Sequence, residues 1–221
     1  MLLDLATARD AVDALALCLI ATGLVSTLLH RFSSFITLVA IQGLLLSGCA
    51  TAVALATGEL HAYLALAMTV VVKVVGVPAV LTLALQRVRQ RREVEPVISH
   101  KLAFVCAVGL TLLAYLVAGP IARAGAETAP NALPAAMTLL LLGLFTMAIR
   151  GTALTQVVGL VMSENGIYLA AIAVTRGLPL AVELGVGVDI LVGVLVMGLV
   201  VRQLDLTFAS IHTDRLKALR G

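Results

Sequence analysis

The chain alternates between long apolar segments and short polar breaks. A membrane-spanning helix needs about 20 predominantly apolar residues, and segments of about this length recur along the whole sequence. The pattern therefore predicts an all-α, polytopic membrane helix bundle of about seven transmembrane helices. These helices are expected near residues 11–29, 34–57, 61–85, 101–120, 133–149, 152–174 and 180–201.

The breaks between these segments carry recognisable end signals. His30-Arg31 is expected to end the first span, and Gly58-Glu59 the second. Gly119-Pro120 is expected to close the fourth span, because proline does not continue a helix readily. Arg150-Gly151 is expected to form a tight turn between the fifth and sixth spans.

Composition narrows the class of protein further. Hydrophobic residues make up 61% of the 221 positions and charged residues only 12%, whereas a soluble domain carries about 25% charge. No sizeable soluble domain is therefore expected. The net charge of +3 reflects the loops, and no nucleic-acid partner is predicted. The N-terminus lacks a basic n-region, so we expect no cleaved signal peptide.

Lys and Arg are distributed unequally between the two sides of the predicted bundle. If the loop 86–100 is cytoplasmic, the outer side carries only Arg9, Arg123 and Arg176. Because cytoplasmic loops are enriched in Lys and Arg, this asymmetry predicts an outer N-terminus and a cytoplasmic C-terminus. The basic loop is also suited to binding anionic membrane lipid. The inner side carries Arg31, Arg87, Arg89, Arg91, Arg92, Lys101, Arg150, Arg202, Arg215, Lys217 and Arg220.

A faint internal repeat appears when the chain is shifted by 116 residues against itself. This shift places Ser47 on Ser163 and Lys73 on Asp189. It predicts a possible 3+1+3 arrangement of parallel repeats about an axis along the membrane normal. The parts would be an N-terminal three-helix half (1–100), a connecting fourth helix with an outer loop (101–132), and a C-terminal three-helix half with a cytoplasmic tail (133–221).

Three charged residues fall near the middle of predicted spans: Lys73, Glu164 and Asp189. A charge at the bilayer centre costs roughly 3 kcal/mol on insertion scales, so each needs a partner charge, a water-lined path or a proton relay. We expect all three to point into protein rather than lipid, with a carboxylate within one bridging water of Lys73. Lys73 could alternatively form a static ion pair or serve a carboxylate of a neighbouring subunit, and each acid could be neutral and structural.

Further polar and small residues surround this predicted site. Gln42 and Asn165 are expected nearby as supporting polar groups, with Gln42 making a packing hydrogen bond. Pro78 follows Lys73 by five residues and is expected to kink the third span. Glu183 lies near the outer end of the seventh span, as an entry or exit group or simply facing water.

The sequence around Asp189 and the remaining ionisable residues complete the set of candidates. Gly185 and Gly193 flank Asp189 on one helix face and would let another backbone pack closely. No histidine pair has metal-ligand spacing, and no nucleophile elbow, phosphate loop or redox motif is present. We therefore predict neither a metal site nor a catalytic residue in this chain.

The last three spans resemble the K subunit of respiratory complex I, called four-L in mitochondria, and component C of the multisubunit cation/proton antiporters. The matching pieces are GLVMSENG, the acid in VDILVGVLVMGLVVR and the final LKALRG. This family carries a buried glutamate in each of its last two helices, and Asp189 with Gly193 fits its acid-x-x-x-Gly pattern. The chain departs from the pattern at Val161, where the family has glutamate, while Glu164 stands three residues later.

Over nearly its full length, the chain resembles the hydrogenase-4 component E family. The pieces that carry this resemblance are VVVKVVGVP, MSENG, ELGV and LKALRG. It implies a non-catalytic subunit of a proton- or sodium-translocating redox complex in the prokaryotic inner (plasma) membrane. Lys73, Glu164 and Asp189 would form a relay at mid-depth, with Glu183 on the outer side.

The resemblance also implies particular partners. These are antiporter-like and anchor membrane subunits, and a peripheral hydrogenase module on the cytoplasmic side. Nickel-iron and iron-sulfur centres would lie on the partners, with no cofactor in this chain. Two alternatives stay open: a subunit of a cation/proton antiporter without a redox module, and a purely structural membrane scaffold.

Overall fold

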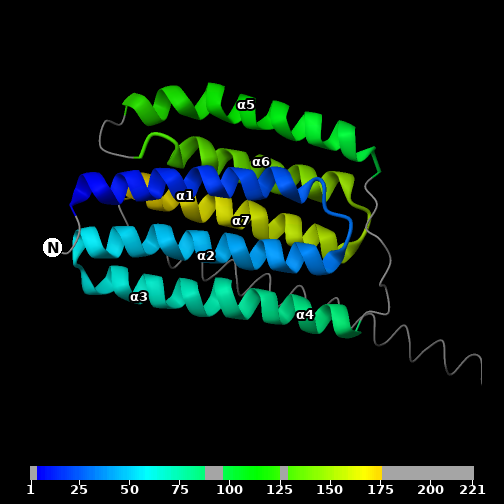
Figure 1. Ribbon diagram of the computed structural model, residues 1–221, viewed down its shortest axis with the longest axis horizontal. Helices are drawn as coiled ribbons and strands as arrows, with labels where there is room; N and C mark the ends of the chain where they lie inside the picture. The colour runs from blue at the N-terminus through cyan, green and yellow to red at the C-terminus, as the bar shows by residue number, and fades with distance from the viewer. Residues whose placement is uncertain (1–3, 88–96, 125–128, 176–221) are drawn as a thin grey trace, which may run out of the picture.

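A computed structural model of the chain describes residues 4–87, 97–124 and 129–175, which form six continuous helices (Figure 1). The third of them consists of α3, a π-helical segment η1 and α4 without a break. The seventh predicted span, 180–201, lies outside the described residues. The elements are α1 (Leu5–Ser26), α2 (Phe32–Thr57), α3 (Leu60–Thr69), η1 (Val70–Gly76), α4 (Val77–Arg87), α5 (His100–Ala124), α6 (Ala132–Ile149) and α7 (Ala153–Thr175).

Five helices of the described part are long and apolar enough to cross a membrane. They coincide with the second to sixth predicted spans. α1 lies alongside them but carries Arg9, Asp10 and Asp13 in its first half. The all-α membrane architecture is therefore confirmed for the described residues. The five segments are Phe32–Thr57, Ala62–Gln86, His100–Ala124, Ala132–Ile149 and Leu154–Val174.

Two predicted helix ends are wrong. α1 ends at Ser26, so the chain has left the helix before it reaches His30. α5 passes through Pro120 and ends at Ala124, so Gly119-Pro120 does not close this span. A proline in the last turns of a helix removes only one backbone hydrogen bond, and the helix can continue past it.

Four helices form a closed ring at the centre of the molecule. α1 contacts α2 and α6, and α7 contacts the same two helices from the other side (Figure 1). α5 packs on α6, and the rod made of α3, η1 and α4 packs on α2. The ring buries α7 most completely, which places this helix where a charged side chain can be shielded from lipid.

The interior of the bundle contains two apolar clusters, one toward each end. The first includes Leu19, Leu46 and Leu169, and the second includes Phe35 and Met162. On α2 and α7, the second cluster stops before Gln42 and Glu164, and the first begins beyond them. The polar residues predicted from sequence therefore lie at the boundary between two apolar layers.

The described helices have the parallel orientation that the repeat predicted from sequence requires. Helices that the repeat pairs are parallel: α1 with α6, and α2 with α7 (Figure 1). They are also direct neighbours in both pairs. The three-helix repeat as a whole stays a prediction, because its last helix lies outside the described residues.

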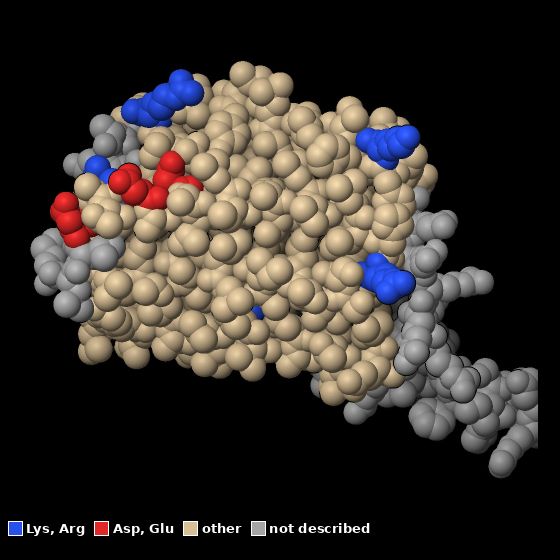
Figure 2. Space-filling view, in the orientation of Figure 1, with Lys and Arg blue, Asp and Glu red and all other residues tan. Residues whose placement is uncertain are grey.

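On the face shown in Figure 2, charged side chains gather at the two ends of the bundle, and the broad band between them is almost entirely uncharged. The end that holds the start of α1 and the α2–α3 turn contains both acidic and basic residues: Asp4, Arg9, Asp10, Glu59 and Arg123. The opposite end contains Arg31 and Lys101. This distribution fits a bundle whose middle faces lipid hydrocarbon.

Candidate functional site

Lys73 lies in the middle of η1, and its side chain is only 4% exposed. Pro78, five residues later, has no N–H, and its ring would collide with the carbonyl group of Val74 in a regular α-helix. The backbone instead changes to π-helical bonding, in which the N–H of Val77 donates to the carbonyl of Val72. The irregularity predicted from Pro78 is thus a π-helical stretch that carries Lys73.

Gly43 allows this stretch to approach α2 closely. A Cβ atom built on Gly43 would lie 2.6 Å from the carbonyl oxygen of Lys73 and 2.9 Å from its carbonyl carbon. Any larger residue would push η1 away from α2. The glycine therefore fixes how deeply the backbone of Lys73 sits against the ring.

The two faces of α7 pack against different elements. Gly159, Ser163 and Gly166 share one face, and Cβ atoms on the two glycines would lie within 2.7 Å of carbonyl oxygens on α6. The Ser163 hydroxyl donates to the carbonyl of Gly159 at 3.1 Å. Because small residues let α7 pack tightly on α6, the opposite face is held toward α2 and η1. That face presents Glu164 and Asn165.

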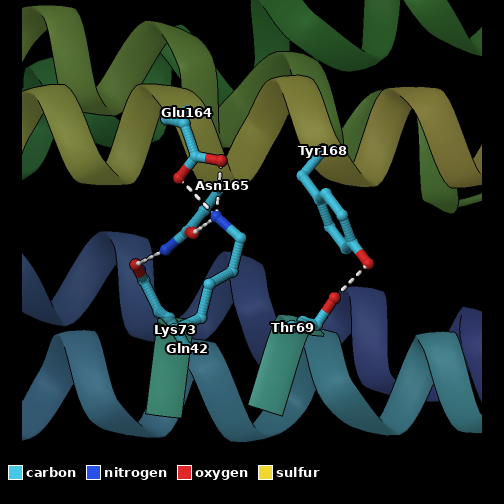
Figure 3. A network of polar contacts seen from close by, with 6 residues as sticks. All are labelled: Gln42, Thr69, Lys73, Glu164, Asn165 and Tyr168. Atoms are coloured by element: carbon cyan, nitrogen blue, oxygen red, sulfur yellow. Dashed lines mark hydrogen bonds and ion pairs between the residues drawn. The ribbon is translucent and has the colours of Figure 1, made fainter. Parts of the chain in front are cut away.

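Lys73 and Glu164 form a buried ion pair (Figure 3). Nζ of Lys73 donates to both carboxylate oxygens of Glu164 and to Oδ1 of Asn165, the last at 3.1 Å. Asn165 donates to Oε1 of Gln42, and Gln42 donates to the hydroxyl of Thr22, each at 3.1 Å. The contacts join η1, α7, α2 and α1 through side chains, of which Glu164, Asn165 and Gln42 are at most 2% exposed.

A second pair of side chains, Tyr168 on α7 and Thr69 at the end of α3, lies about one helical turn from the ion pair. The hydroxyl groups of Tyr168 and Thr69 are 2.5 Å apart (Figure 3). Nζ of Lys73 lies 5.2 Å from the centroid of the Tyr168 ring. Sequence reasoning missed both residues, although Tyr168 follows Glu164 by four residues and Thr69 precedes Lys73 by four, which places each on the same face as its charged neighbour.

The geometric predictions for this site are confirmed for the described residues. Lys73 and Glu164 point into protein, they touch directly, and Gln42 and Asn165 lie beside them. Lys73 thus has a carboxylate partner in its own chain. Glu183, Asp189, Gly185 and Gly193 lie outside the described residues, and the relay role of the whole set stays a prediction.

The chemistry available to the pair follows from its surroundings. Two opposite charges in a low-dielectric interior are stabilised by each other and by the hydrogen bonds around them. Transfer of one proton from the ammonium to the carboxylate would leave both groups neutral. Loss of a proton would leave one negative charge on the carboxylate, and gain of a proton would leave one positive charge on the ammonium. Exchange of a proton at this pair therefore changes the net charge of the buried site by one.

A second buried cation, Arg150, lies in the α6–α7 turn and is 2% exposed. Its Nη2 donates to the carbonyls of Leu29 at 3.0 Å and Thr27 at 3.5 Å. Its guanidinium lies 5.2 Å from the ring centroid of Phe35. Burial lowers the pKa of Arg150, although a guanidinium stays protonated in proteins. The sequence predicted this residue in a tight turn on the basic side of the membrane; in the structure it also links the α6–α7 turn to the α1–α2 turn.

At the other end of the bundle, Asp13 binds the start of α6. Its two carboxylate oxygens accept from the backbone N–H of Asn131 at 2.7 Å and from the Asn131 side chain at 2.5 Å. Tyr115 donates to the side-chain oxygen of Asn131. A carboxylate at a helix N-terminus is favourable because it accepts from unsatisfied N–H groups and complements the helix dipole.

Among the described residues, no group of three or more His, Cys, Asp and Glu could hold a metal ion.

Comparison with known proteins identifies two kinds of relative. The uncharacterized protein Rv0085 of Mycobacterium tuberculosis is 35% identical over 130 residues, which is 59% of each chain. The match thus spans less than two thirds of that relative. Hydrogenase-4 component E of Escherichia coli K12 is 28% identical over 151 residues, covering 68% of this chain and 70% of the relative. The same protein of Shigella flexneri matches equally well.

No family model matches the chain, and no solved structure matches it. The relationship therefore rests on the pairwise matches and on the membrane architecture of the described helices. Both agree with the resemblance seen in the sequence. The chain is a membrane protein and a distant homologue of hydrogenase-4 component E.

Proposed function

We propose that this chain is a non-catalytic, integral membrane subunit of a proton- or sodium-translocating redox complex. In this proposal, Lys73 and Glu164 form the mid-depth part of the ion relay, and Asp189 and Glu183 continue it. The observation that carries the proposal is the ion pair itself. A lysine and a glutamate, each at most 4% exposed, meet between two apolar layers of a membrane bundle.

The homology to hydrogenase-4 component E supports the choice of complex. The proposed partners are antiporter-like and anchor membrane subunits together with a hydrogenase module on the cytoplasmic side. Nickel-iron and iron-sulfur centres would belong to that module. The proposed location is the inner membrane of a prokaryotic cell.

The proposed topology has seven spans, with an outer N-terminus and a cytoplasmic C-terminus. It is supported by the Lys and Arg residues of the described part, since Arg31, Arg87, Lys101 and Arg150 lie at one end of the bundle and Arg9 and Arg123 at the other. A Cys-less chain carrying single cysteines in place of Glu127 or Glu93 tests it. An impermeant thiol reagent added from outside should label position 127 and leave position 93 unlabelled; the reverse pattern would refute the topology.

The relay is tested in the assembled complex. The chain is purified by an affinity tag together with its membrane partners, which are identified by mass spectrometry, and proton or sodium transport is measured in vesicles. Glu164→Gln and Lys73→Met should preserve the complex and its redox turnover with an artificial acceptor while transport is lost. Glu59→Gln and Lys101→Met, at exposed positions of the same residue types, should leave transport intact.

A structural role is the rival that the geometry also favours, because the pair is held by further hydrogen bonds from Asn165 and Gln42. A purely structural pair predicts that the same substitutions remove subunits from the complex before they affect transport. Full transport by Glu164→Gln in an assembled complex would exclude Glu164 from the relay.

A further inference from the structure

Two contacts between the α3–η1 rod and α7 lie in register. Lys73 meets Glu164, and Thr69 meets Tyr168. Each pair is displaced from the other by four residues on both elements, which is about one helical turn. The aromatic contact is therefore placed so that it can act directly on the ion pair.

The direction of the Tyr168–Thr69 hydrogen bond follows from counting hydrogens. A threonine hydroxyl has one hydrogen, and that of Thr69 donates to the carbonyl of Ala65 at 2.9 Å. In the bond between the two hydroxyls, Tyr168 is therefore the donor and Thr69 the acceptor. Both side chains are 4% exposed, so the phenol is held in one orientation by a partner that is itself anchored to its own helix.

The held ring lies against the charged end of Lys73. Nζ is 5.2 Å from the ring centroid, within the range of about 6 Å in which an aromatic face attracts a cation. A lysine side chain has four rotatable bonds and much conformational freedom. A fixed aromatic face next to Glu164 restricts that freedom and favours the charged ammonium at this place.

We propose that Tyr168 is the positioning residue of the ion pair: its ring holds the Lys73 ammonium against Glu164, and Thr69 holds the ring. The proposal deepens the proposed function, on which its effect on transport rests. The contact itself is independent of transport and can be measured in the full chain without a partner complex.

The contact is tested spectroscopically, because the chain has three tyrosines and no tryptophan. In a Tyr63→Phe/Tyr115→Phe background, the ultraviolet absorption band of tyrosine reports on Tyr168 alone. Lys73→Met should shift this band, and Lys101→Met, at the exposed start of α5, should leave it unchanged. Lys73→Gln replaces the methionine variant if that one does not fold. If the absorption band of Tyr168 stays at the same wavelength when Lys73 loses its charge, the proposal is overturned.

The consequence for transport is tested with two substitutions at one position. Tyr168→Leu removes the ring and should slow transport on the order of tenfold, whereas Tyr168→Phe keeps the ring and should slow it by about threefold at most. Equal losses in both variants would indicate a merely structural tyrosine and overturn the proposal. If Lys73→Met itself transports normally, the proposed function fails, while the absorption band still decides whether Tyr168 positions the lysine.

Discussion

Lys73 and Arg150 are both buried cations, but their surroundings differ. Lys73 lies midway along the bundle and meets the carboxylate of Glu164. Arg150 lies at one end, and its described partners are the carbonyls of Thr27 and Leu29 and the ring of Phe35. Among the described contacts, the positive charge of Lys73 meets a carboxylate, whereas that of Arg150 meets backbone carbonyls and an aromatic ring.

Because of this difference, the site of Lys73 and Glu164 can change its charge, whereas the site of Arg150 cannot. A carboxylate accepts a proton and a lysine releases one when their surroundings change. Carbonyl groups do not titrate, and a guanidinium keeps its proton in proteins. The proposed ion exchange therefore belongs to the centre of the bundle, whereas Arg150 connects the α1–α2 turn to the α6–α7 turn at its end.

The largest expected effect is at the central pair. Glu164→Leu leaves a buried ammonium without its carboxylate and should lower the free energy of unfolding by roughly 3–5 kcal/mol. The double variant Lys73→Met/Glu164→Leu should recover most of that stability, because an apolar pair replaces a desolvated ion pair, yet it should not transport ions. Thermal unfolding in lipid nanodiscs and vesicle transport measure the two effects. Recovery of transport in the double variant would contradict the assignment.

Arg150 should behave differently from the central pair. Arg150→Met leaves the buried carbonyl of Thr27 and the partly buried carbonyl of Leu29 without this donor and should destabilise the chain by about 2–3 kcal/mol. Transport per assembled complex should stay normal. Arg123→Met, at the exposed last turn of α5, is the matched control and should change neither quantity. Loss of transport in a fully assembled Arg150→Met complex would erase the distinction between the two cations.

A smaller effect is expected from the glycine that supports Lys73. In Gly43→Ala, the new methyl group would overlap the carbonyl of Lys73, and the resulting displacement of η1 should cost about 1–3 kcal/mol. Transport should fall because Lys73 moves with η1. Gly109→Ala is the control, since a Cβ atom there meets nothing within 4 Å; it should be neutral or slightly stabilising in the same thermal unfolding assay.

The smallest effect is expected at Asp13, a partly exposed carboxylate at the opposite end from Arg150. Asp13→Asn keeps one oxygen acceptor for the start of α6 but removes the negative charge, which should cost about 0.5–1 kcal/mol. Thermal unfolding measures this loss, and transport should be unaffected. A transport defect would show that this end of the bundle also takes part in ion movement.

Much of the fold could be predicted because lipid imposes a simple rule on helix length. The second to sixth spans follow directly from apolar runs of sufficient length. The ends of α1 and α5 could not be predicted in this way. His30 and Pro120 are each compatible with positions inside or outside a helix, and the packing around them determines where the helix ends. The ring arrangement is also set by packing, which a repeat of residue types does not specify.

The site shows the same division. Lys73 and Glu164 were predictable because a charge in an apolar span is costly wherever it stands. Arg150 was not, because it lies in a turn, where an arginine ordinarily meets water or lipid headgroups. Tyr168 and Thr69 are amphipathic residues of a kind common in membrane helices. Their part in the site becomes visible only from their contact one helical turn away from the charged pair.

The π-helical stretch also affects how this sequence aligns with others. A π-helical turn holds one more residue than an α-helical turn, so η1 can be regarded as an insertion absorbed within a span. A homologue lacking one residue between Val70 and Val72 would have a continuous α-helix of almost the same length. Because the wider turn absorbs the extra residue, the lysine of such a homologue would keep about the same face relative to α3. A shared lysine in an alignment of this region therefore indicates a shared site even where the residue count between Thr69 and Pro78 differs by one.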